Sequence, residues 1–101
     1  MMHGVRKLVT IVTEAGLERE LVTEIETSGA SGYTVSDARG CDSRGRRSAS
    51  WEHNTNIRIE ILCDTELAQR IVERLRTRYY GDYAMVMWLQ DVAVFRPEKF
   101  V

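Results

Sequence analysis

The stretch IRIEI, residues 57–61, alternates apolar and charged side chains without a break. This period of two is typical of a strand with one buried face and one wet face, because successive side chains of a strand point to opposite sides of its sheet. A single strand of this kind is not stable alone. The sequence on either side must therefore supply partner strands and the helices that cover the buried face.

Two amphipathic helices are predicted, one on each side of this strand. The first follows Gly16 and ends at Ser28-Gly29, and the second opens at Asp64, an N-cap residue followed by an acid in the first turn. In both segments apolar residues recur at the spacing of one helix face. These residues are Leu17, Leu21, Val22 and Ile25 in the first helix and Leu67, Ile71, Val72 and Leu75 in the second.

Three further strands complete the predicted fold. They are KLVTIVTE (7–14), SGYTVSD (31–37) and the apolar run from Tyr83 to Phe95, which forms one long strand or two short ones and which Pro97 ends. The order strand, helix, strand, strand, helix, strand indicates a single α+β domain over residues 1–101. Its class is the ferredoxin-like βαββαβ sandwich, a four-stranded antiparallel sheet with both helices on one face.

The second face of this sheet has no helix to cover it. Met85, Met87, Trp88 and Leu89 add apolar surface beyond what two short helices can cover, and an uncovered apolar face predicts self-association. A chain of 101 residues also buries only a modest core, which oligomerisation supplements. We therefore expect a closed oligomer.

Composition argues against several classes of function. The formal net charge of -1 and the lack of an aromatic platform on the central strands argue against nucleic-acid binding. The apolar run near the N-terminus is too short for a signal sequence or a membrane span, so we expect a cytoplasmic location. Cysteines are usually reduced in the cytoplasm, so we expect free thiols rather than a disulfide. No nucleophile stands beside a base, so we expect that the protein is not an enzyme. Cys41, His3 and His53 lack the spacing of a zinc site, so we expect no metal site, and we expect no cofactor.

The strongest functional signal is a long basic loop over residues 38–54. Its central part, RGCDSRGRRSAS (39–50), combines four arginines with glycines and serines, and so little apolar surface cannot build core. Guanidinium groups, small hydroxyls and turned backbone amides are suited to phosphate or another small oxyanion. The alternative that composition leaves open is a solvated loop without a ligand.

The stretches KLVTIVTE, SGASGYTVSDARGCDSRGRRS, IRIEIL and YYGDYAMVMWL together resemble the PII-like signalling proteins of inorganic-carbon metabolism. This group comprises the SbtB proteins and their carboxysome-associated relatives, called CPII, and the resemblance runs from Lys7 to about Phe95. It implies a homotrimer whose three intersubunit clefts bind adenine nucleotides, ADP or AMP. The loop over residues 38–54 would be the T-loop of these proteins, and residues 96–101 a short tail.

The resemblance also implies which residues hold the ligands. Bicarbonate would lie beside the nucleotide phosphates, held by Arg47 or otherwise by Arg46. The residues implied for the nucleotide are Gly32, Tyr33, Thr34 and Val35 of one subunit, Ser43, Arg44 and Arg47 at the phosphates, and Ala84, Met85 and Val86 of the neighbour beside the adenine.

Two departures from the sequences of these relatives narrow the function that we expect. The tail FRPEKFV lacks the cysteine hairpin of many SbtB proteins, so redox-controlled nucleotide hydrolysis is not carried over and the carboxysome-associated group is favoured. Gly81-Asp82-Tyr83 replaces the lysine-containing phosphate loop of nitrogen-sensing PII proteins, which argues against sensing of 2-oxoglutarate and MgATP.

The implied mechanism is a loop that orders when the nucleotide binds and so changes the affinity for a partner protein. By resemblance, the partner would be a bicarbonate transporter or another protein of carbon uptake. Two alternatives stay open. One is a trimeric CutA-like protein without nucleotide sensing, and the other is an SbtB-type transporter regulator that responds to cyclic AMP or AMP.

Overall fold

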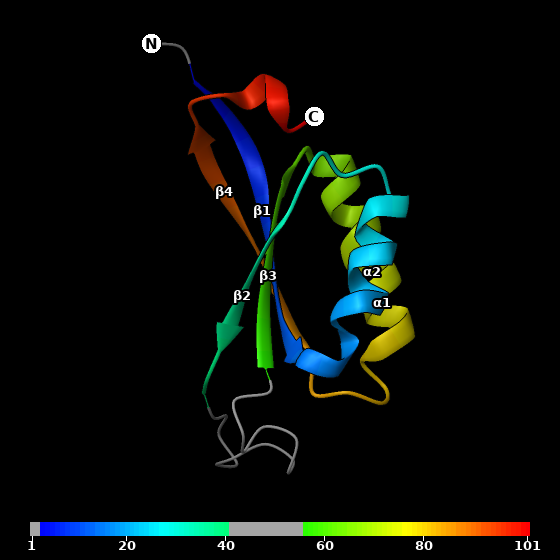
Figure 1. Ribbon diagram of the computed structural model, residues 1–101. Coiled ribbons are helices and arrows are strands. Elements are labelled where there is room, and N and C mark those ends of the chain that lie inside the picture. The colour runs from blue at the N-terminus through cyan, green and yellow to red at the C-terminus, as the bar shows by residue number, and fades with distance from the viewer. Residues whose placement is uncertain (1–2, 41–55) are drawn as a thin grey trace.

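The computed structural model describes residues 3–40 and 56–101 (Figure 1). The strands are β1 (Gly4–Glu14), β2 (Thr34–Ala38), β3 (Asn56–Cys63) and β4 (Val86–Val94), and the helices are α1 (Glu18–Thr27) and α2 (Thr65–Tyr79). The short 3-10 helices η1 (Ala15–Leu17) and η3 (Pro97–Lys99) precede α1 and follow β4. Within these ranges, no helix is both long enough and apolar enough to cross a membrane.

The four strands form one antiparallel sheet in the order β2-β3-β1-β4. Both helices lie against the same face of this sheet (Figure 1). The predicted ferredoxin-like fold is therefore confirmed. The apolar run between Tyr83 and Phe95 contains one strand, β4, rather than two.

The core forms between the helices and one face of the two central strands. Val9 pairs with Ile61 and Ile11 pairs with Ile59, and all four side chains are fully buried. The predicted apolar stripes of the helices pack against them, through Leu21, Ile25, Leu67, Ile71 and Leu75. Cys63 also lies in this core as a free thiol, and burial raises its pKa to about 11. A thiol that is buried and protonated in this way is unreactive.

Local signals set the ends of the helices as predicted. The carboxylate of Asp64 accepts a hydrogen bond of 2.8 Å from the backbone N–H of Leu67, which caps α2. Beyond the C-terminus of α1, Gly29 has a φ of 94°, a conformation that glycine adopts without strain.

The ends of the strands differ from the prediction, because pairing with a neighbour decides them. The second strand begins at Thr34 rather than Ser31, since the ladder with β3 starts at the pair Thr34–Glu60. The first strand begins at Gly4 rather than Lys7, since Gly4 still pairs with Val94 of β4.

The sheet face turned away from the helices, here called the open face, has a mixed character. Thr10 lies between its strand partners Glu60 and Trp88, and its side chain is fully buried. The guanidinium carbon of Arg58 lies 5.6 Å from the ring centroid of Trp88. Arg58 and Trp88 are partners of Val12 and Thr10, so this cation–π contact crosses β1 diagonally.

Only one of the four apolar residues expected on the open face lies there. Trp88 is on it and is 38% exposed. Met85 is buried in the core and Met87 packs against the core, while Leu89 pairs with Val9 and so lies on the side of the helices. Of these four residues only Trp88 therefore contributes to the open face, which also carries Leu8 and Leu62, and self-association through this face stays a prediction.

Candidate functional site

A cavity of about 390 Å³ opens beside the start of β2, on the open face of the sheet. We call it the β2 pocket. It is lined by Leu8 of β1, by Gly32, Tyr33 and Thr34, by Glu60 and Leu62 of β3, and by Phe100 of the C-terminal segment.

The strand register brings the walls of the β2 pocket together. Leu8 pairs with Leu62 and Thr34 pairs with Glu60, so their side chains stand in neighbouring positions on the same face. These residues alternate with the buried Val9, Ile59 and Ile61, which turn to the opposite face. The pattern that builds the core therefore also builds the pocket.

Among the described residues, the lining of the β2 pocket is mainly apolar and contains a single acid. Leu8, Leu62 and the ring of Phe100 supply apolar walls, and Glu60 supplies the one carboxylate that lines it. Arg58 Nη2 donates to Glu60 Oε2 across 3.4 Å, which leaves the other carboxylate oxygen free of contact with Arg58. A carboxylate only accepts hydrogen bonds, so the pocket suits a flat, partly apolar group that carries an N–H or O–H donor.

A second cavity, of about 1090 Å³, is an open groove along α1. Tyr33 borders both cavities and is 38% exposed. Residues lining the groove include three acids of α1, Glu18, Glu20 and Glu24, together with Arg19, Arg78 and Tyr79.

Contacts between the helices already occupy two of the three acids of the α1 groove, Glu20 and Glu24. Tyr79 Oη donates to Glu20 Oε2 at 2.8 Å, and Arg74 Nε donates to Glu24 Oε1 at 2.8 Å. Arg78 Nη1 lies 3.1 Å from Glu24 Oε2 as an ion pair, without the alignment of a hydrogen bond. Burial and, secondarily, the hydrogen bond to Glu20 raise the pKa of Tyr79 to about 12. These groups join α1 to α2, and we assign no ligand to the groove.

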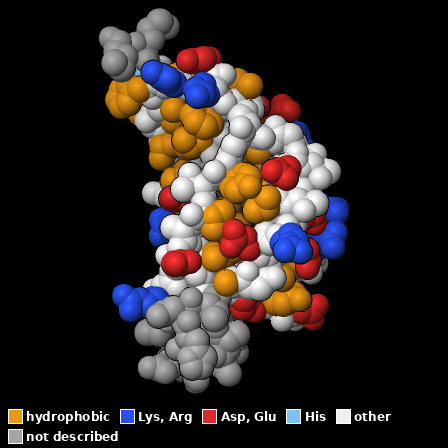
Figure 2. Space-filling view, viewed as in Figure 1, with side chains coloured by type: hydrophobic (Ala, Val, Ile, Leu, Met, Phe, Trp, Pro, Cys, Tyr) orange, Lys and Arg blue, Asp and Glu red, His pale blue; other side chains and the backbone are white. Residues whose placement is uncertain are grey.

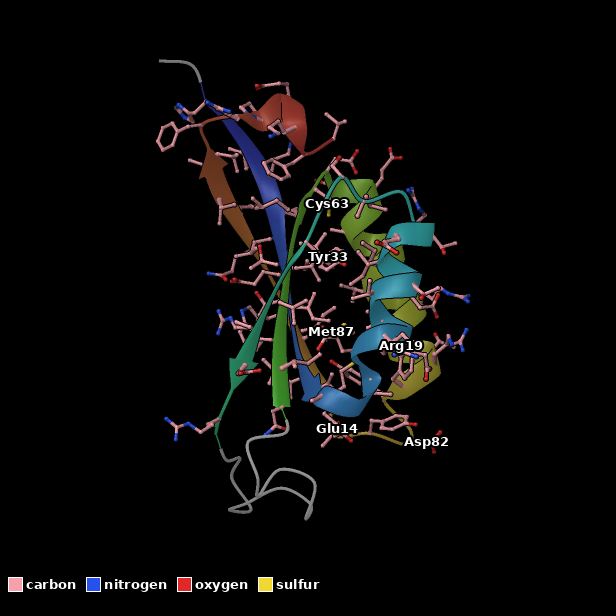
Figure 3. All side chains as sticks on the ribbon, in the orientation of Figure 1. Glu14, Arg19, Tyr33, Cys63, Asp82 and Met87 are labelled. Carbon is pink, nitrogen blue, oxygen red and sulfur yellow. The ribbon has the colours of Figure 1, made fainter. Side chains whose placement is uncertain are left out.

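The sequence-derived site residues fall at opposite edges of the sheet, beside β2 and beside β4. Gly32, Tyr33 and Thr34 line the β2 pocket, whereas the side chain of Val35 packs against the core. Figure 3 shows Tyr33 well separated from Glu14 and Asp82, which lie near the end of the sheet where β1 finishes and β4 begins. Within one subunit, the two halves of the predicted site are therefore apart.

The second half of the predicted site comprises residues near the start of β4 and residues of the basic loop, and only the former lie within the described residues. Val86 opens β4, pairs with Val12 and is 39% exposed, and Ala84 is partly buried. The side chain of Met85 is 5% exposed, so only its backbone is available to a ligand. The remaining predicted residues, Ser43, Arg44, Arg46 and Arg47, lie outside the described residues.

Four lining residues of the β2 pocket were missed from the sequence: Leu8, Glu60, Leu62 and Phe100. Glu60 was recognisable as a residue of the wet face, since it alternates with the buried isoleucines of β3. Phe100 gave no signal, because it is far in sequence from every other residue of the pocket.

The chain is similar to known proteins in both sequence and structure. The family model described as nitrogen regulatory protein P-II matches residues 6–99 of the chain. A solved PII-like signalling protein from Thermus thermophilus is 46% identical in sequence, with 100% of each chain covered and a TM-score of 0.85.

More distant solved structures share the fold. CPII from Thiomonas intermedia, bound to ADP and bicarbonate, is 22% identical, with 99% of this chain and 98% of that chain covered and a TM-score of 0.84. CPII was also solved bound to ADP, AMP and acetate, with the same identity, coverage and TM-score.

Proposed function

The chain belongs to the nitrogen regulatory protein P-II family, and from that premise we propose that it is a signalling protein that binds an adenine nucleotide, ADP or AMP. In this proposal the base lies between the β2 pocket of one subunit and Ala84, Met85 and Val86 of its neighbour, and the phosphates meet Ser43, Arg44 and Arg47 of the basic T-loop. Bicarbonate binds beside the phosphates, at Arg47 or Arg46. The P-II family match favours this function over the CutA-like alternative.

The observation that carries the proposal is the chemistry of the β2 pocket. Adenine is a flat ring with an amino group that donates hydrogen bonds, and the pocket offers apolar walls together with the acceptor Glu60. The pocket contains three of the residues implied by the family resemblance, Gly32, Tyr33 and Thr34. The distant relative CPII binds ADP and bicarbonate, which supports the choice of ligands.

The separation of the two half-sites supports a site that is shared between subunits. Thr34 lies on the edge strand β2 and Val86 lies on the opposite edge strand β4, with β3 and β1 between them. In a closed ring with head-to-tail contacts, the pocket end of one subunit meets a different surface of the next. We therefore propose a homotrimer in which Ala84, Met85 and Val86 of one subunit complete the neighbour's pocket.

Regulation then follows from the charge of the T-loop. A nucleotide that pairs with Arg44 and Arg47 favours loop conformations that bring these side chains together. The altered loop changes affinity for a partner protein, for which we propose a bicarbonate transporter or another component of carbon uptake. A regulator that responds to cyclic AMP instead of ADP is the second candidate.

Calorimetric titration of ADP, AMP, ATP and cyclic AMP, each with and without bicarbonate, tests the proposal. We expect binding of ADP or AMP that bicarbonate strengthens, and a loss of about tenfold in affinity in Arg47→Ala, since a charge-assisted hydrogen bond contributes about 1.5–3 kcal/mol. Arg70→Ala on the exposed surface of α2 is the matched control and should bind as the wild type does. Absence of binding to all four nucleotides would overturn the proposal.

A further inference from the structure

The C-terminal segment folds back along β1, and Arg6 holds it there. Arg6 Nε donates to the carbonyl oxygen of Phe100 and Arg6 Nη2 donates to that of Pro97, each at 2.9 Å. The Pro97 carbonyl also accepts from the backbone N–H of Phe100 at 3.1 Å. One side chain of β1 therefore fixes both ends of the turn that carries Phe100. Figure 2 shows apolar side chains gathered at this end of the molecule.

A close backbone approach at Gly4 supports the same arrangement. A Cβ atom at Gly4 would lie 2.9 Å from Pro97 Cβ and 3.1 Å from Pro97 Cγ. The proline ring cannot swing aside as a flexible side chain would, so the segment reaches this position only because residue 4 has no side chain.

We propose that Arg6 is a positioning residue that holds Phe100 as a wall of the β2 pocket and so sets the affinity for the base of the ligand. The inference rests on the proposed function, because the wall matters only if the pocket binds a ring. Phe100 is partly buried and lines the pocket together with the strand residues Leu8 and Leu62. Stacking of a base on an aromatic ring is worth about 1–3 kcal/mol, which corresponds to roughly 5- to 150-fold in affinity, and we expect the lower part of this range, about tenfold.

A double-mutant cycle on ADP affinity tests whether Arg6 acts through Phe100. We expect Arg6→Gln and Phe100→Ala each to weaken ADP binding about tenfold, and the double variant to bind no more weakly than Phe100→Ala alone. Gly4→Ala, which displaces Pro97 by a separate route, should resemble Arg6→Gln. Lys7→Gln is the matched control, since Lys7 loses the same charge from the same strand but pairs with Asp91 of β4.

Amide hydrogen exchange of Phe100, measured without ligand, separates this inference from the proposed function. The amide should exchange faster in Arg6→Gln and Gly4→Ala than in the wild type and Lys7→Gln. Unchanged exchange, unchanged ADP affinity in Arg6→Gln, or fully additive losses in the double variant would each overturn the role of Arg6. If the wild type binds no ADP, the proposed function is wrong, and Phe100 then has no effect on the binding of a base. The exchange rates then still decide whether Arg6 holds the segment.

Discussion

The hydroxyl of Tyr79, near the end of α2, donates a hydrogen bond of 2.8 Å to the carboxylate of Glu20, near the start of α1. Backbone hydrogen bonds of a helix run within that helix, so side-chain contacts of this kind fix the relative position of the two. Tyr79 is 2% exposed, and its ring packs within the core.

Tyr79→Phe should lower the free energy of unfolding by about 1.5 kcal/mol, because it removes a hydrogen bond to a charged acceptor while the ring stays in place. Urea unfolding monitored by circular dichroism measures the change. Tyr80→Phe is the control and should have a smaller effect, because Tyr80 is 42% exposed and water can replace its contact with Met87. Equal losses in both variants would contradict the role of Glu20.

Burial of Tyr79, together with this hydrogen bond, makes stability depend on pH in the alkaline range. The pKa of Tyr79 is raised from 10.0 to about 12, chiefly by burial, so the folded protein retains a proton that the unfolded chain releases. The stability from this group is therefore fully present below pH 10 and declines between about pH 10 and 12. Unfolding of the wild type and Tyr79→Phe over this range should show their stability difference shrinking, and a constant difference would contradict the assignment.

Two threonines of β1 should respond in opposite ways to the same substitution. Thr10 and Thr13 are both fully buried, but the Thr10 hydroxyl has no hydrogen-bond partner among the described residues, whereas Thr13 donates to Glu14 Oε1 at 2.8 Å. Thr10→Val should raise the free energy of unfolding by about 1 kcal/mol, and Thr13→Val should lower it by about 1 kcal/mol. Denaturation at one fixed protein concentration measures both. Destabilisation by Thr10→Val would indicate that its hydroxyl has a partner in the assembled protein.

The proposed trimer can be tested with two neighbouring residues of β4. Trp88 and Leu89 are 38% and 42% exposed, but Trp88 lies on the open face beside Arg58 and Leu89 lies on the side of the helices. If the open face is the subunit interface, Trp88→Lys should dissociate the oligomer, because it buries a second cation next to Arg58. Leu89→Lys should leave it intact. Sedimentation velocity distinguishes the two, and an unchanged mass in Trp88→Lys would place the interface elsewhere.

Glu60 should distinguish adenine from hypoxanthine if the base occupies the β2 pocket. The adenine amino group donates to a carboxylate, whereas the oxygen at the same position of hypoxanthine repels it. We expect the wild type to bind ADP about tenfold more tightly than inosine diphosphate, and Glu60→Gln to reduce this ratio. Glu26→Gln, on the exposed surface of α1, serves as the control. A ratio unaffected by Glu60→Gln would exclude this carboxylate from base recognition.

The sequence predicted the fold well wherever the signal is local. The alternation in residues 57–61, the N-cap Asp64 and the closing Gly29 each depend on a few neighbouring residues, and the structure contains all three features. Strand ends were less predictable, because Thr34 begins β2 only where Glu60 is available to pair with it.

The site was predictable only in part for the same reason. Gly32, Tyr33 and Thr34 were identified from a motif within one short stretch, whereas Phe100 joins them only through the contacts of Arg6 and Gly4 with the C-terminal segment. The side chain of Met85 turns into the core, which the sequence did not specify, because an apolar residue next to a strand end can turn inward or outward. Contacts between residues that are distant in sequence decide both the position of Phe100 and the orientation of Met85.

β1 lies in the interior of the sheet although it comes first in the sequence. Its two neighbours, β3 and β4, come much later, and Gly4 pairs with Val94. At a synthesis rate of roughly 5–20 residues per second, β1 leaves the ribosome several seconds before β4 exists. During that interval Val9 and Ile11 have no permanent cover, so the sheet can close around β1 only after β4 has been translated.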